Sequence, residues 1–129
     1  MNALLTPWDT EFGLPPFTAI SDDDVSLAFE AALSEARANI AAIAADPAAP
    51  NFANTIEALE LAEGLLDRVG GVFSNLAGAA STEAREALQR DLAPKMSAFS
   101  SEVTNNAALF ARIDTLWQLR GGLALTPEQ

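Results

Sequence analysis

Residues 54–78 carry the pattern that most limits how this chain can fold. Apolar side chains recur there every three or four positions, at Ile56, Leu59, Ala62, Leu66, Val69, Phe73 and Leu76, with Leu61, Leu65 and Val72 widening the stripe. This spacing places them on one face of an α-helix broad enough for two neighbours. Asn54 and Glu57 predict its N-terminal cap, and Gly78 predicts its end. We expect one continuous helix, roughly 37 Å long, at the centre of the fold.

A second helix is predicted before this stretch, from Ser21 to about Asp46. Ser21 and Asp24 form a capping pair at its start. Its apolar face consists of Val25, Ala28, Phe29, Ala32, Leu33, Ala36, Ile40 and Ile43. Pro47 and Pro50 then predict the turn into the central helix.

Two further helices are predicted after residue 78. One begins at Ser81 and keeps the helical interval through Arg85, Leu88, Leu92, Met96, Phe99 and Val103. Pro94 lies inside this pattern and predicts either a kink or two abutting segments. Asn105 and Asn106 mark the next turn. The last helix is expected over residues 107–120, ending at Gly121, with Leu109, Phe110, Ile113, Leu116 and Trp117 directed inward.

The first twenty residues form a different kind of segment. Pro7, Gly13, Pro15 and Pro16 alternate with Trp8, Phe12, Phe17 and Ile20. Dense prolines disfavour a helix, so we expect an extended strap over residues 1–20 that packs through its aromatic side chains. Residues 21–129 are predicted to form an all-α, up-and-down antiparallel bundle of about four long helices. An alanine content of about a fifth supports close helix packing, and Tyr and β-branched runs are absent.

The charge balance argues against several classes of partner. The net charge is −11, and Lys95 is the only lysine. Nucleic acids and anionic membranes require clustered cations, so neither is expected as a partner. The chain has no cysteine, which is typical of a cytoplasmic protein. Its first residues lack the pattern of a signal peptide, and no apolar run reaches the length of a membrane span.

The residue types needed for several catalytic schemes are missing. Without histidine, neither a Ser/His or Cys/His nucleophile nor an H-E-x-x-H zinc site can form. The carboxylates that cluster on the central helix are Glu57, Glu60, Glu63 and Asp67. Facing inward they would hold a hard cation or act as acid and base, but they lie opposite the apolar stripe beside Arg68. A solvated face is therefore the preferred interpretation. We predict no catalytic, cofactor-binding or metal-binding residue in the chain.

Other features also have two interpretations. Gly70 and Gly71 interrupt a helical pattern, which favours close helix contact over a hinge. Trp8 and Trp117 are expected to pack in the core or strap, although each would also suit a ligand platform. Asn75 is expected at the edge of the bundle. The closing Thr126-Pro-Glu-Gln129 is a helix start with no helix after it, so we expect the natural polypeptide to continue.

Several stretches resemble the N-terminal region of the thimet oligopeptidase and peptidyl-dipeptidase family of zinc metallopeptidases. They are Gly13-Leu-Pro-Pro-Phe17, Ala28-Phe-Glu-Ala-Ala-Leu33, Ile40-Ala-Ala-Ile43, Pro50-Asn-Phe52, Asn54-Thr-Ile56, Ala58-Leu-Glu60, Leu65-Leu-Asp-Arg-Val69, Leu109-Phe-Ala-Arg-Ile113 and Leu125-Thr-Pro-Glu-Gln129. They follow the family order across the whole chain, and none of them is a catalytic signature.

The resemblance implies a cytoplasmic, mostly helical parent enzyme that is several times longer than this chain. In such a parent, short peptides are hydrolysed in a deep channel by a zinc ion that an H-E-x-x-H helix and a further Glu hold in the C-terminal half. No zinc ligand transfers to these residues. They would form one wall of the channel, with the C-terminal catalytic lobe as partner. The alternative from another class is a complete, small helical module that binds a protein partner.

Overall fold

The computed structural model describes residues 1–129 and is built from helices without any strand. The all-α class predicted from the sequence is therefore confirmed. The main elements are α1 (Asp22–Ala45), the π-helix η4 (Phe52–Glu57), α2 (Ala58–Leu61), α3 (Gly64–Ala79), α4 (Glu83–Thr104) and α5 (Ala107–Leu119). Short 3₁₀ turns cover Ala3–Leu5, Glu11–Gly13, Phe17–Ala19 and Arg120–Gly122. No helix combines the length and the apolar character needed to cross a bilayer.

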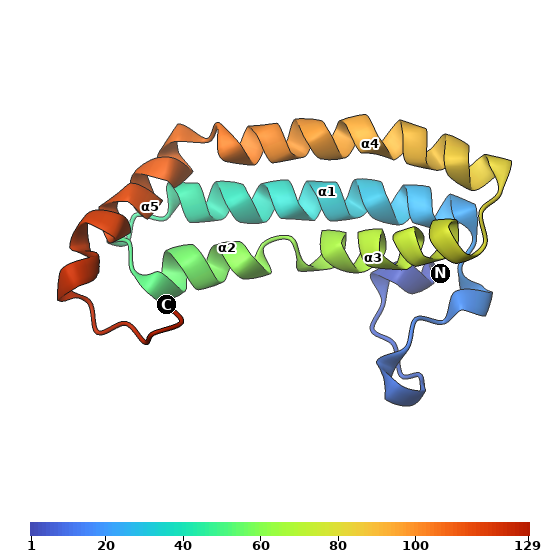
Figure 1. Cartoon of the computed structure of the whole chain (residues 1–129), viewed down its shortest axis with the longest axis horizontal. Helices are drawn as coiled ribbons and strands as arrows, with labels where there is room; N and C mark the ends of the chain where they lie inside the picture. Colours follow the sequence, from blue (N-terminus) through green and yellow to red (C-terminus); the bar gives the residue numbers. More distant parts are fainter.

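The central element is α1, and the prediction that residues 54–78 hold this place is wrong. Figure 1 shows α1 lying between α4 on one side and α2 and α3 on the other, while α5 crosses the far end of α1. The chain direction reverses between α1 and α3 and again before α4. The alanine-rich face of α1 explains its position, because small side chains let a helix approach neighbours on both sides.

The start and the buried face of α1 agree with the sequence prediction. The Asp24 backbone N–H donates to Ser21 Oγ at 3.1 Å, and the Ser21 backbone N–H donates to the Asp24 carboxylate at 3.0 Å. This reciprocal pair satisfies two N–H groups that a helix start leaves without partners. All eight predicted apolar residues are buried, from Val25 to Ile43.

The predicted helix over residues 54–78 is divided. It begins as the π-helix η4, capped by Asn51 rather than Asn54, and the helix breaks at Ala62 and Glu63 before α3 starts at Gly64. Glycine weakens a helix at this point. The side chain of Asn39 in α1 donates to the Ala62 carbonyl at 3.0 Å, which satisfies a group that the break exposes.

The last two helices have nearly the predicted bounds but a different pattern of burial. The cap of α4 is Thr82 instead of Ser81, and α4 runs through Pro94 as one helix. Phe110 and Trp117, predicted to point inward from α5, are 65% and 60% exposed. α5 packs mainly against the end of α1 and η4, and one of its apolar sides stays uncovered.

The first twenty residues are not one continuous extended strap, since three 3₁₀ turns interrupt them. Leu4 is fully buried, and Asn2 donates through its side-chain amide to the Asp24 carbonyl at 2.7 Å. Residues 9–19 project from this end of the molecule (Figure 1). Among them, Phe12 is 88% exposed and has a φ of 58°.

Candidate functional site

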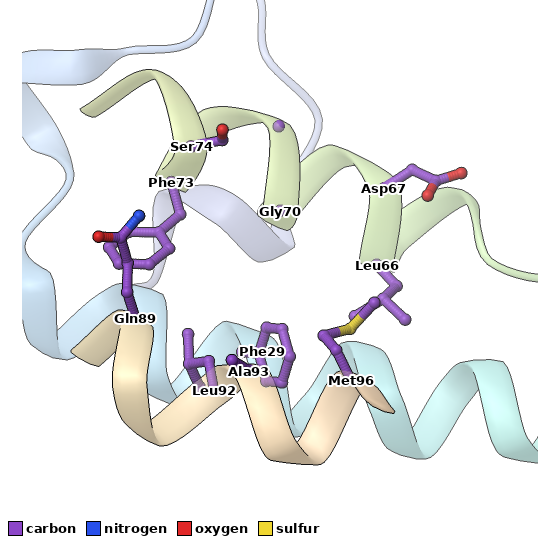
Figure 2. Close-up of a pocket in the computed structure, with 11 residues that line it drawn as sticks. Phe29, Leu66, Asp67, Gly70, Phe73, Ser74, Gln89, Leu92, Ala93 and Met96 are labelled. Atoms are coloured by element: carbon purple, nitrogen blue, oxygen red, sulfur yellow. The ribbon is translucent and has the colours of Figure 1, made fainter. Parts of the chain in front are cut away.

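A groove of about 380 Å³ runs between α3 and α4, with α1 as its floor. Figure 2 shows Leu66 and Phe73 from α3 facing the side of α4, and Leu66 and Met96 pointing toward one another. Phe29 of α1 lies at the bottom of the groove and is almost completely buried. The polar side chains that line it are Asp67, Ser74 and Gln89. An apolar floor with a few polar groups is typical of a binding site.

Gly70 and Gly71 line this groove, and the prediction that they allow close helix contact is wrong. A methyl group added to either glycine would have no heavy atom within 4 Å apart from neighbouring parts of its own helix. The two glycines therefore leave open space where side chains would otherwise fill the groove. Each glycine destabilises the helix by about 1 kcal/mol relative to alanine, and no close packing at these positions within this chain offsets that loss.

Replacing Gly71 with alanine is expected to raise the free energy of unfolding by about 0.5–1 kcal/mol. The added methyl group meets no neighbour, and alanine restricts the unfolded chain more than glycine does. Urea denaturation followed by circular dichroism measures the change. A loss of stability would show that α3 needs glycine for close contact after all.

The four carboxylates weighed as acid, base or cation ligands do not come together. Glu57, Glu60 and Asp67 are exposed, as expected for a solvated face, whereas Glu63 is half-buried. No group of three or more Asp and Glu side chains is close enough to hold a metal ion. Burial, with a smaller contribution from the negative charge of Asp67, raises the pKa of Glu63 above its ordinary value.

Replacing Glu63 with glutamine is expected to stabilise the fold slightly at neutral pH. Because its pKa is raised, Glu63 is protonated more easily in the folded state than in the unfolded state. The wild type therefore has the full benefit of this difference below the ordinary pKa of 4.5 and loses it as the pH rises through the raised pKa. The variant should gain about 0.5 kcal/mol or less near pH 7, because water screens this partly exposed group, and nothing near pH 4 or below. Urea denaturation at both pH values measures this.

Glu57→Gln is the matched control, since it removes one exposed carboxylate from the same segment. Its stability should change little at either pH. A gain for Glu63→Gln that persists in acid would contradict the assigned burial effect.

The two tryptophans lie in different surroundings. Trp8 is half-buried, donates from its indole nitrogen to the Ala3 carbonyl at 2.7 Å, and has the guanidinium of Arg68 at 5.3 Å from its ring centre. The packing role predicted for Trp8 is therefore confirmed. Trp117 is exposed on α5, where the guanidinium of Arg120 lies 3.8 Å from its ring centre. Packing in the core is wrong for Trp117. Asn75 is exposed on α3.

Sequence reasoning missed a buried arginine. Arg112 of α5 is 7% exposed and donates to the carbonyls of Asp46 and Ala48 at 2.7 and 3.1 Å. It also donates to the carboxylate of Asp46 at 3.3 Å and to Thr55 Oγ1 at 3.4 Å. Arg112 therefore ties α5 to the end of α1 and to η4. Its position, three residues after Leu109 and four before Leu116, was the signal for an inward-facing residue.

The residue types of the chain bear on whether the zinc ion implied by the resemblance would fit here. Zinc in proteins is held by His, Cys and carboxylate ligands in close groups, and the sequence has neither His nor Cys. Because no carboxylate group substitutes for them, a zinc site does not fit these residues. What the arrangement provides is an apolar groove and exposed apolar surface, which are binding features.

Comparison with known proteins points to peptidases. The chain is 36% identical over 127 residues to the dipeptidyl carboxypeptidase of Salmonella typhimurium, a match that covers 98% of this chain and 19% of that protein. It is 34% identical over 128 residues to the dipeptidyl carboxypeptidase of Escherichia coli, covering 99% and 19%. It is also 32% identical over 108 residues to the oligopeptidase A of Salmonella typhimurium, covering 83% and 16%.

These similarities support a relationship between this chain and a family of peptidases, in agreement with the resemblance described for the sequence. The chain spans about a fifth of the length of the dipeptidyl carboxypeptidases it matches. No protein-family model matches it.

Proposed function

We propose that this chain is the N-terminal helical domain of a zinc-dependent peptidyl-dipeptidase or oligopeptidase that hydrolyses short peptides. The observation that carries the proposal is the similarity to a dipeptidyl carboxypeptidase along 98% of the chain. A short shared motif would indicate only a local feature, but similarity along five helices indicates a shared domain.

In this proposal the residues described here shape the substrate channel and do not perform the chemistry. Zinc and its ligands belong to a C-terminal catalytic lobe of the same polypeptide, because these residues include no His or Cys and no close group of three carboxylates. The groove between α3 and α4 is the candidate for the wall that faces the peptide. Its apolar floor and the open space at Gly70 and Gly71 suit an extended peptide. The cytoplasmic location implied by the resemblance stays a prediction.

The test compares the complete gene product with residues 1–129 alone. We expect the complete product to bind zinc, to hydrolyse short peptides, to lose this activity with a chelator and to regain it with added zinc. Residues 1–129 alone should show neither stoichiometric zinc nor hydrolysis. Hydrolysis that resists chelation, or activity in residues 1–129 alone, would contradict the proposal.

The second candidate function is a complete helical module that binds another protein. Exposed apolar side chains such as Leu61, Phe110 and Trp117 favour a binding role of some kind. They favour the longer polypeptide more strongly, since we expect a complete small module to present a mainly polar surface. A natural gene that stops after codon 129 would favour the complete module over the domain of a longer polypeptide.

A further inference from the structure

An apolar surface lies at the end of the molecule where α5 meets η4 and α2. Two adjoining hollows of about 170 and 410 Å³ share Phe52 and Ile56 as lining residues. We define the α5–η4 surface by the apolar residues Phe52, Ile56, Leu61, Trp117 and Leu123 and the charged residues Glu57, Glu60 and Arg120. Leu61 is 76% exposed and Trp117 is 60% exposed, which is a large apolar exposure for such residues.

The backbone below this surface is unusual as well. Phe52, Ile56 and Glu57 project from a π-helix of six residues, a rare conformation that is frequent at functional sites. Arg112 holds this π-helix in place from beneath, through its contact with Thr55. The surface is therefore anchored to buried residues of the domain.

The two acidic side chains on this surface form no ion pair within the chain. Glu57 and Glu60 line the larger hollow, and neither takes part in an ion pair. Four of the seven basic side chains are already paired with other carboxylates. Arg68 and Arg120 lie against Trp8 and Trp117. Arg120 lines the adjoining smaller hollow, and the carboxylates of Glu57 and Glu60 remain open to a positive charge on a partner.

We propose that the α5–η4 surface docks a helix of the catalytic lobe that carries Lys or Arg beside large apolar side chains. This inference rests on the proposed function, and it names the surface and the chemistry of the contact. The last residue of the chain, Gln129, lines the smaller hollow, so the polypeptide of the proposed longer protein leaves the domain at this surface. A second copy of the chain is a poor occupant, because each copy carries a net charge of −11.

The experiment titrates purified residues 1–129 with the remainder of the polypeptide, expressed separately from the same gene. Isothermal titration calorimetry gives the Kd, and the indole N–H signal of Trp117 in NMR spectra reports the contact. The test variant is Glu57→Lys with Glu60→Lys. The control is Glu83→Lys with Asp91→Lys, which changes the net charge equally on exposed residues of α4, on the other side of α1. Circular dichroism melting checks that both variants fold.

We expect the test variant to raise the Kd by about tenfold or more, the control by less than about threefold, and added salt to weaken the wild type most. Three results would overturn the docking proposal while leaving the peptidase proposal intact. They are equal effects of the two variants on the Kd, a Trp117 signal that does not shift during the titration, and dimerisation of residues 1–129 through this surface. If the remainder bound no zinc, or if the complete product did not hydrolyse peptides, the proposed function would be refuted, and with it this inference.

Discussion

Replacing Arg112 with methionine is expected to lower the free energy of unfolding by about 3 kcal/mol. The methionine keeps most of the volume but removes every hydrogen bond that the guanidinium donates. The partly buried contacts to the carbonyls of Asp46 and Ala48 and the buried contact to the hydroxyl of Thr55 are then lost. The carboxylate of Asp46 also loses its ion pair. Since small domains are stable by only about 5–15 kcal/mol, this is a large fraction of the total.

Urea denaturation followed by circular dichroism measures the loss, and Arg90→Met is the matched control. Arg90 lies exposed on α4 and takes part in no ion pair or side-chain hydrogen bond. Its replacement should change the stability by less than about 0.5 kcal/mol. Equal effects at the two positions would show that Arg112 does not tie α5 to α1 and η4.

Replacing Leu33 with alanine is expected to cost about 2–5 kcal/mol. Leu33 is 2% exposed in the middle of α1, the helix that packs against α3, α4 and α5. The smaller side chain loses apolar burial and leaves a cavity that straight helices cannot easily close. Thermal and urea denaturation of the same samples measure the effect.

Leu27→Ala is the control for this substitution, because Leu27 lies on the same helix but is 67% exposed. The same chemical change there should alter the stability by less than about 0.5 kcal/mol. If Leu33→Ala cost no more than Leu27→Ala, α1 would not be the core of this fold.

Local signals predicted α1 well. Its cap depends on two residues three positions apart, and its buried face follows from a regular interval of apolar residues. Both are properties of neighbouring residues, so no knowledge of tertiary structure was needed. The same reasoning located the turns at Pro47 and Asn106 to within a residue or two.

The features that the sequence did not predict depend on contacts between distant residues. The break before Gly64 is supported by a hydrogen bond from Asn39, 23 positions earlier than Ala62. Trp117 was expected inside because it is apolar, but it lies 60% exposed beside a hollow that residues of η4 and of the C-terminal segment also line. Arg112 was passed over because charged residues usually face solvent, although its spacing matched the inward face.

The same distinction applies to the candidate site. Gly70 and Gly71 stood out in the sequence, but only the fold reveals that they border a groove rather than a close contact. The peptidase relationship came from many short stretches in order, and the comparisons support it over nearly the whole chain.

The most direct test of the central proposal is to read the natural gene beyond codon 129. If this chain is one domain of a zinc-dependent peptidase, the reading frame should continue to about five times its length, as in the dipeptidyl carboxypeptidases it matches, and should encode an H-E-x-x-H sequence. A stop codon directly after Gln129, or a long frame without any such zinc-binding sequence, would contradict the proposal.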